Sequence, residues 1–190
     1  MNTKDITIII PTLNRPSLVD AVQSVLNQSD EHWKLIVVGD GVKPTVTSDD
    51  PRIKWFEDKK HGSAGEIRNV GIHLARTEWV GFLDDDDVLM EDYVKQWCFQ
   101  HKDHEMLIYQ MMNRNNVTGG HFPISVFQDV KYGNIGMNFA IKKKHIIEVG
   151  GFEAEYPGFN EDWALIEKVT KNVEPFWLDY LGYYVRPKES

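Results

Sequence analysis

Short apolar segments alternate with amphipathic segments along the first half of the chain, and this alternation most limits the possible folds. Residues 6–10, 35–38 and 79–83 are apolar runs of the kind that forms strands buried on both faces of a sheet. Between them, residues 18–26 and 65–75 carry apolar side chains at helical spacing. The alternation predicts an α/β fold with a mostly parallel central sheet flanked by helices, whose ligands bind beyond the carboxyl ends of the strands.

Weaker signals continue the pattern to the end of the chain. Residues 53–56 predict a further strand, and a helix is expected with Met90, Tyr93, Val94, Trp97 and Cys98 on one face. The remaining expected elements are strands at 106–111, 135–141, 176–178 and 183–185 and helices at 142–149 and 162–170. Residues 113–133 are polar and aromatic with two adjacent glycines, and we expect a loop or lid there.

Composition and charge exclude several classes of protein. A chain of 190 residues that is 42% hydrophobic has enough apolar material for one domain with a real core. Its 21 basic and 29 acidic residues give a net charge of −8, so it lacks the basic field that nucleic acids require. No nucleic-acid partner is expected. Any phosphate group must be held by local hydrogen-bond donors or by a metal ion.

Cysteine and histidine usage indicates neither disulfides nor a zinc centre. The single Cys98 cannot form an internal disulfide or a cysteine cage, and the seven histidines show no zinc-ligand spacing. Cys98 lies on a predicted apolar helix face, so no cysteine nucleophile is expected. Neither an export signal nor a transmembrane segment is apparent, and a cytoplasmic location is the expectation.

Four consecutive aspartates, Asp84 to Asp87, directly follow an apolar strand. Side chains two residues apart in an extended turn point the same way, so Asp84 and Asp86 can converge on one hard cation such as Mg²⁺ or Mn²⁺. Such an ion keeps positions open for the oxygens of a diphosphate. The alternative is a solvated acidic turn. The four aspartates lie at the ligand-binding edge of the predicted sheet, and this placement favours the metal site over the solvated turn.

A small-residue loop, residues 61–65, leads into a helix that carries Arg68 in its first turn. Free backbone N–H groups at a helix start and a guanidinium can both bind an anion. The loop lacks the glycine and lysine pattern of a P-loop and the glycines of dinucleotide binders, so an ordinary helix cap is the alternative.

Two further acidic positions have both a chemical and a structural interpretation. Asp40 follows the second strand and could accept hydrogen bonds from a nucleobase, although Asp-Gly is also a common turn pair. Glu161 and Asp162 stand at a predicted helix start, where acids favour the helix dipole. Alternatively, one of these two carboxylates removes a proton from an attacking hydroxyl.

Taken together, these segments resemble the family 2 glycosyltransferases of the GT-A fold. The resemblance spans nearly the whole chain. It is carried, in order, by Ile8 to Arg15 (IIIPTLNR), Val37 to Gly41 (VVGDG), Arg68 to Gly71 (RNVG), Phe82 to Asp87 (FLDDDD), Val149 to Phe152 (VGGF) and Glu161-Asp162.

The resemblance implies one GT-A (Rossmann-like) domain over residues 1–190, with a nucleotide-binding half at about 1–100 and an acceptor and catalytic-base half at about 101–190. It implies metal-dependent, inverting transfer of one sugar from a nucleotide-diphosphate sugar, with a UDP-sugar favoured, to a hydroxyl. The acceptor would be a glycan or a lipid-linked or protein-linked hydroxyl, and the cofactor Mn²⁺ or Mg²⁺.

The resemblance also implies a role for individual residues. Asp162 would be the general base, with Glu161 supporting it or contacting the acceptor. Asp84 and Asp86 would hold the metal ion. Donor contacts would come from Pro11, Thr12, Asn14, Arg15, Asp40, Arg68, Asn69, Asp84 and Asp85.

Some features depart from the family pattern and leave alternatives open. Gly39 stands where the family commonly has one of two paired acids, so contact with the nucleobase rests on Asp40 alone. Acceptor contacts are expected from residues 113–133, from residues 183–186 or from another domain or subunit. A GT-A module that binds a nucleotide-sugar or glycan without turnover is the main alternative. A sugar nucleotidyltransferase is less favoured because the loop after the first strand has no glycine.

Overall fold

One sheet joins strands from both halves of the chain, and helices cover it on both faces. The computed structural model describes residues 2–114, 121–123, 136–153 and 161–186. The strands run in the order β3-β2-β1-β4-β8-β6-β9-β5, with β7 paired to β6. Their bounds are β1 Asn2–Thr12, β2 Trp33–Asp40, β3 Ile53–Asp58, β4 Thr77–Phe82, β5 Val88–Leu89, β6 Met106–Arg114, β7 His121–Pro123, β8 Phe139–Lys142 and β9 Phe176–Val185.

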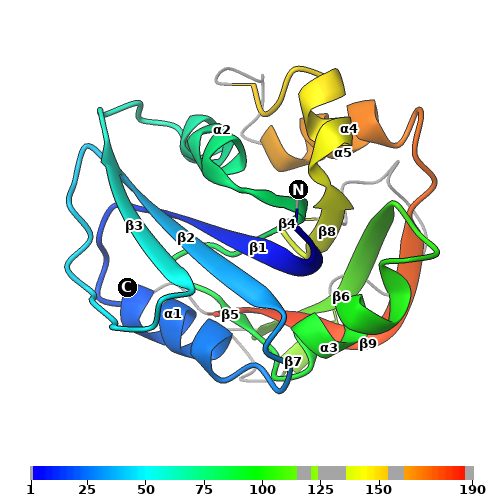
Figure 1. Ribbon diagram of the computed structural model, residues 1–190, viewed down its shortest axis with the longest axis horizontal. Helices are drawn as coiled ribbons and strands as arrows, with labels where there is room; N and C mark the ends of the chain where they lie inside the picture. The colour runs from blue at the N-terminus through cyan, green and yellow to red at the C-terminus, as the bar shows by residue number, and fades with distance from the viewer. Residues whose placement is uncertain (1, 115–120, 124–135, 154–160, 187–190) are drawn as a thin grey trace.

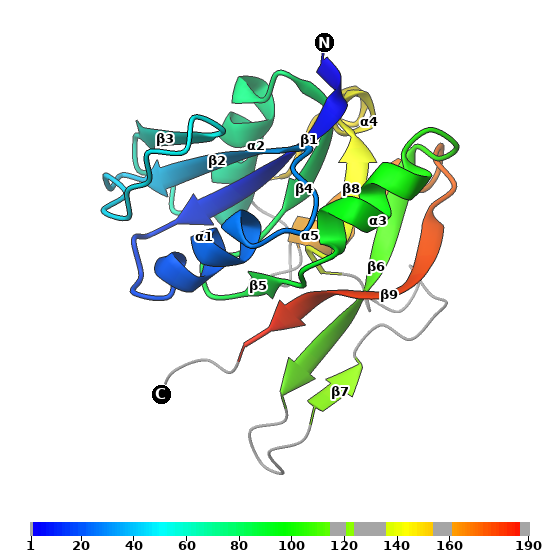
Figure 2. The same cartoon turned by 60° about the horizontal axis from the view of Figure 1, so that its bottom comes forward.

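The helices lie on opposite sides of this sheet. Figure 1 shows α2, α4 and α5 on one side and α1 and α3 on the other. Figures 1 and 2 also show the sheet curling, so that β5, the last strand in its order, lies beside α1. The bounds are α1 Leu18–Leu26, α2 Ala64–Leu74, α3 Tyr93–Gln100, α4 Lys143–Glu148 and α5 Glu161–Val169.

The expected parallel sheet is confirmed in the first half of the chain. β1 pairs in parallel with β2 and β4, and β2 pairs in parallel with β3. Side chains of β1 and β2 are buried on both faces, as their apolar composition predicts. Beyond β4, β8 and β6 join through antiparallel pairings, and β9 then runs parallel to β6. The carboxyl ends of β1, β2 and β4 therefore share one edge of the sheet.

Three expectations are corrected. Residues 113–114 and 121–123 are strand and not loop, while the other residues of 113–133 lie outside those described. The helix expected to include Met90 begins only at Tyr93, because Val88 and Leu89 pair with β9 as a short strand. The two strands expected near the C-terminus form one strand, β9, whose pairing with β6 shifts in register.

Among the described residues, no helix has the length and apolar character needed to cross a membrane.

Close packing between α2 and β1 depends on one glycine. A Cβ added at Gly71 would lie 2.4 Å from Cγ2 of Ile9, a fully buried side chain. Gly71→Ala gains about 1 kcal/mol of helix propensity, but overpacking of a core costs about 1–3 kcal/mol. The overlap with the β-branched Ile9 should make the net change in stability unfavourable, because its Cγ2 cannot move away unless the strand moves with it.

We therefore expect Gly71→Ala to lower the free energy of unfolding, measured by urea titration. Gly136→Ala is the matched control, because an added Cβ there would come no closer than 3.6 Å to a neighbouring atom. A Gly71→Ala variant as stable as the wild type would contradict the tight contact between α2 and β1.

Candidate functional site

A cavity of about 510 Å³ opens beside the carboxyl ends of β1, β2 and β4. This is the edge at which the sequence predicts ligand binding. It gathers many of the predicted site residues, namely Pro11, Thr12, Arg15, Asp40, Arg68, Asp84, Asp85, Asp86 and Glu161. The predicted residues Asn14, Asn69 and Asp162 are not among those that line it. Residues from five separate segments of the chain thus meet only because of the fold.

The acidic loop, defined as residues 84–87, presents three carboxylates to one point. Oxygens of Asp84, Asp86 and Asp87 all lie within 4.8 Å of one another. Asp87 is only 6% exposed. Burial, together with the charges of Asp84 and Asp86, raises its pKa to about 7. Oxygen ligands with excess negative charge suit a hard divalent cation such as Mg²⁺ or Mn²⁺. The group therefore fits a metal ion, with Asp87 added to the predicted pair.

Asp85 faces the loop that follows β1. Its Oδ2 accepts hydrogen bonds from the Thr12 hydroxyl at 2.6 Å and from the Leu13 N–H at 3.3 Å. Burial raises the pKa of this carboxyl despite these bonds. Arg15 bridges to Oδ1 of Asp85 at 3.2 Å and to Asp86 at 2.9 Å. Asp85 therefore joins the acidic loop to the first loop of the site.

Arg68 lies in the floor of the cavity and is 3% exposed. Its guanidinium donates to Asp84 at 2.5 Å and to Glu161 at 3.0 Å. Burial opposes its positive charge, but the two carboxylates outweigh burial and the pKa of Arg68 is raised. Its Nε atom has no hydrogen-bond partner among the described residues. This one side chain thus connects α2 with the acidic loop and with the start of α5.

Asp40 holds the small-residue loop in place. Its two carboxylate oxygens accept the backbone N–H groups of His61 at 2.5 Å and Gly62 at 2.9 Å. Gly62 has a positive φ of 79°, a conformation that suits glycine. The next residue, Ser63, caps α2 and accepts the N–H of Glu66. The capping interpretation is therefore confirmed, while Gly62 and Ser63 also line the cavity.

The two predicted asparagines bond to the protein itself. Asn14 has a positive φ of 64°, and its side-chain oxygen accepts the N–H and the hydroxyl of Thr45, both at 2.9 Å. Asn69 donates to the carbonyl of Phe152 at 2.8 Å and accepts its N–H at 2.9 Å. Asn69 thus fastens α2 to the segment after α4. The predicted donor contacts of these residues remain predictions.

Glu161 and Asp162 begin α5. Oδ1 of Asp162 accepts the N–H of Trp163 at 2.8 Å. Burial raises the pKa of Asp162, and the charges of Glu161 and Asp84 add to the effect. A carboxylate with a raised pKa is a better proton acceptor than an exposed one.

The end of β9 holds the acidic loop, a role that sequence reasoning missed. The buried Tyr183 hydroxyl accepts the N–H of Asp84 at 3.1 Å and donates to Asp87 at 2.9 Å. Arg186 donates its N–H to Asp87 at 3.0 Å and its Nε–H to the carbonyl of Asp86 at 2.8 Å. No spacing in the sequence connects residues almost 100 positions apart. The only signal was the unbroken acidic run, which included Asp87.

A curled α/β sheet with an acidic turn after its fourth strand defines the GT-A class. Solved structures confirm this fold. The chain superposes on Staphylococcus aureus TarS (residues 1–349) in complex with UDP-GlcNAc with a TM-score of 0.79, covering 98% of this chain and 59% of that chain at 20% identity. Against another crystal structure of TarS 1–349, the TM-score is 0.77, with 96% of this chain and 60% of that chain covered, again at 20% identity.

The chain belongs to glycosyl transferase family 2, whose profile matches residues 7–154. An uncharacterized glycosyltransferase of Rickettsia conorii is 29% identical over 143 residues, or 71% of this chain and 23% of the relative. The putative colanic acid biosynthesis glycosyl transferase WcaA of Escherichia coli is 36% identical over 94 residues, or 45% and 34%. The GalNAc(5)-diNAcBac-PP-undecaprenol beta-1,3-glucosyltransferase of Campylobacter jejuni is 37% identical over 95 residues, or 45% and 30%.

These relatives are much longer than this chain. The matched segments cover only 23%, 20% and 23% of three Rickettsia glycosyltransferases. The family profile ends at residue 154, before Glu161, Asp162 and β9. The acidic loop is therefore within the matched segment, while the expected base and the residues of β9 that hold the loop lie beyond it.

We expect Asp87 to make the stability of the metal-free protein depend on pH. Its pKa is raised to about 7 in the folded protein, so the folded state keeps a proton that the unfolded chain has lost. The contribution of this proton to the free energy of unfolding is fully present below about pH 4 and is lost as the pH rises through about 7.

Urea titrations in EDTA between about pH 4 and pH 8 test this. With rising pH, the wild type should lose free energy of unfolding relative to Asp87→Asn. Asp103→Asn, which removes an exposed carboxylate, should keep the wild-type profile. Parallel profiles for the wild type and Asp87→Asn would mean that Asp87 is not the source of the dependence.

Proposed function

We propose that this chain is the catalytic GT-A domain of a metal-dependent, inverting glycosyltransferase. It moves one sugar from a nucleotide-diphosphate sugar, with a UDP-sugar favoured, to a hydroxyl acceptor. The observation that carries the proposal is the convergence of three carboxylates within 4.8 Å at the cavity edge. Asp162 follows the cavity-lining Glu161 at the start of α5, and the charge of Asp84 helps to raise its pKa. Family membership and the GT-A fold support the proposal.

Asp84, Asp86 and Asp87 would hold Mn²⁺ or Mg²⁺. When bound, a divalent cation neutralises charge that grows on the leaving diphosphate. The protein contributes by fixing the ligand oxygens before the donor arrives. Tyr183 accepts the N–H of Asp84 and donates to Asp87, and Arg186 donates to Asp87 and to the carbonyl of Asp86. These bonds hold the loop, so that little reorganisation would be needed during transfer.

The donor would bind along the cavity wall formed by the first loop and the small-residue loop. Pro11, Arg15 and Asp40 line this wall. Thr12 and Asp85 also line the cavity and hydrogen-bond to each other, while Asn14 and Asn69, which do not line it, would act by fixing neighbouring segments of the protein. TarS has been solved with UDP and with UDP-GlcNAc. That neighbour supports a UDP-sugar as the donor of this chain.

Arg68 would meet the diphosphate at the side where negative charge develops. In the structure its guanidinium already balances Asp84 and Glu161. A diphosphate held at the acidic loop through a cation adds negative charge beside it, and an arginine can share its fork of donors among such oxygens. The hydrogen bonds to Asp84 and Glu161 use only part of the five N–H donors of the guanidinium, so terminal N–H groups remain for this contact.

Asp162 would remove the proton from the acceptor hydroxyl as that oxygen attacks the anomeric carbon. Attack from the side opposite the diphosphate inverts the configuration at this carbon. General-base assistance contributes about 10²–10⁴-fold to a rate. Glu161 supports Asp162 through its ion pair with Arg68. We propose a hydroxyl of a glycan, or a lipid-linked or protein-linked hydroxyl, as the acceptor.

Removing a metal ligand should abolish metal-dependent donor binding. We expect Asp86→Asn to bind UDP-GlcNAc equally weakly with and without Mn²⁺, because a neutral amide does not replace a carboxylate in holding the ion. Isothermal titration calorimetry with and without Mn²⁺ measures this, with the exposed Asp103→Asn as the control. Wild-type affinity in Asp86→Asn, or no effect of Mn²⁺ on the wild type, would contradict the metal assignment.

Removing the base should separate binding from transfer. We expect Asp162→Asn to keep the donor affinity of the wild type and to lose about 10²-fold or more in turnover, measured as UDP release with an acceptor panel. A wild-type rate in Asp162→Asn would place the base elsewhere. Donor binding without any transfer by the wild type would favour the non-catalytic binding module.

A further inference from the structure

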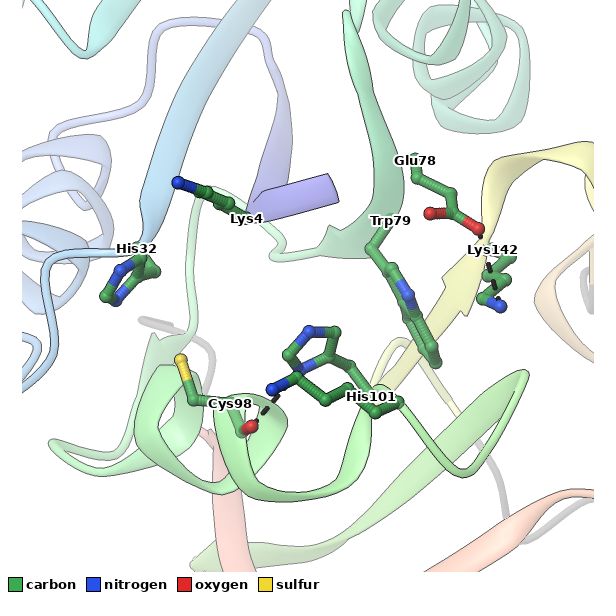
Figure 3. Close-up of a pocket in the computed structure, with 8 residues that line it drawn as sticks. Lys4, His32, Glu78, Trp79, Cys98, His101 and Lys142 are labelled. Carbon is green, nitrogen blue, oxygen red and sulfur yellow. Dashed lines mark hydrogen bonds and ion pairs between the residues drawn. The ribbon is translucent and has the colours of Figure 1, made fainter. Parts of the chain in front are cut away.

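A second cavity lies at the amino ends of the strands, at the opposite edge of the sheet from the proposed donor site. Its volume is about 590 Å³. Figure 3 shows Lys4 of β1, Trp79 of β4 and two residues of α3 or its C-cap, Cys98 and His101, around it. His32, immediately before β2, closes one side. The proposed glycosyl transfer makes no use of this cavity.

Three side chains with different ligand atoms converge at the edge of this cavity. Asp30, His32 and Cys98 each place a metal-ligating atom within 4.8 Å of the other two. His32 Nδ1 lies 2.6 Å from Oδ1 of Asp30. The same carboxylate helps to raise the pKa of the Cys98 thiol. In Figure 3 the Cys98 sulfur projects from α3 toward the side occupied by His32.

The combination of ligands selects a class of metal. Mg²⁺ and Mn²⁺ prefer oxygen ligands, whereas a thiolate, an imidazole and a carboxylate together suit Zn²⁺. One thiolate and one carboxylate also balance the two positive charges of the ion. With bonds of about 2.0–2.3 Å to tetrahedral zinc, the ligand atoms would lie roughly 3.3–3.8 Å apart. Because all three ligand atoms lie within 4.8 Å of one another, the widest separation has to shorten by no more than about 1.5 Å. His32, with its side chain 54% exposed, has room to move.

A role for Cys98 as a nucleophile fits this site less well. Burial, with a contribution from Asp30, raises the pKa of its thiol to about 12. Reactive cysteines instead have a lowered pKa in electropositive surroundings.

We propose that Asp30, His32 and Cys98 bind Zn²⁺, with water or a small anion in the fourth position on the side of the cavity lined by Lys4 and His101. Coordination forms a sulfur–zinc bond and releases the thiol proton of Cys98 to solvent. The ion would connect the segment between α1 and β2 to α3, two parts of the chain far apart in sequence. This site is independent of the acidic loop and of the proposed transfer reaction.

Co²⁺ tests this proposal, because a cobalt–thiolate bond gives a charge-transfer absorption that carboxylate ligands cannot produce. Adding Co²⁺ to the full chain should produce this band, and Zn²⁺ should then displace the cobalt and remove it. Cys98→Ser should abolish the band, and His32→Gln and Asp30→Asn should weaken or abolish it. His73→Gln, which removes an exposed histidine of α2, should keep it. Asp86→Asn should also keep it, because the acidic loop lacks sulfur.

Thermal unfolding gives a second measurement. Zn²⁺ should raise the midpoint of the wild type and of Asp86→Asn, because a ligand that binds only the folded state stabilises it. It should raise the midpoint less in Cys98→Ser and His32→Gln. No thiolate band in the wild type would overturn the proposal. So would a band that persists unchanged in both His32→Gln and Asp30→Asn, because the cysteine would then bind the metal alone.

Discussion

Repulsion among the four aspartates of the acidic loop is the constraint around which the cavity is arranged. Like charges this close destabilise a folded chain unless each is offset. The protein offsets these charges with residues from several segments, so the loop becomes the meeting point of elements from distant parts of the chain. The partners are Arg68 for Asp84, Thr12 and Arg15 for Asp85, Arg15 again for Asp86, and Tyr183 and Arg186 for Asp87. A cation held by the loop would complete this compensation.

The position of β9 explains how a site at the edge of a sheet becomes well ordered. Loops that follow parallel strands are exposed, and function usually requires a second element to fix them. Here β9 runs beside β6 and ends under the acidic loop, where Tyr183 and Arg186 bond to its backbone and to Asp87. The first half of the sheet thus supplies the carboxylates, and a strand from the end of the chain orients them.

The sequence predicted the first half of the fold well because local patterns specify it. Buried parallel strands read as apolar runs, and each helix between them has its own periodicity. The same rules placed Asp40, Asp84 and Asp86 at the carboxyl ends of the strands, and so at one edge of the sheet. They could not show that β5 pairs with β9 or that Asp87 turns inward, because these depend on contacts between distant residues. The convergence of His32 and Cys98 was hidden for the same reason.

The shared guanidinium of Arg68 has a consequence for the timing of events in the cavity. A cation that bridges two carboxylates cannot leave one of them without changing the field at the other. Any ligand that draws Arg68 away from Asp84 therefore also alters Glu161, and with it the electrostatic surroundings of the adjacent Asp162 at the start of α5. A ligand on one side of the cavity would thereby change the electrostatic surroundings on the other side through a single side chain.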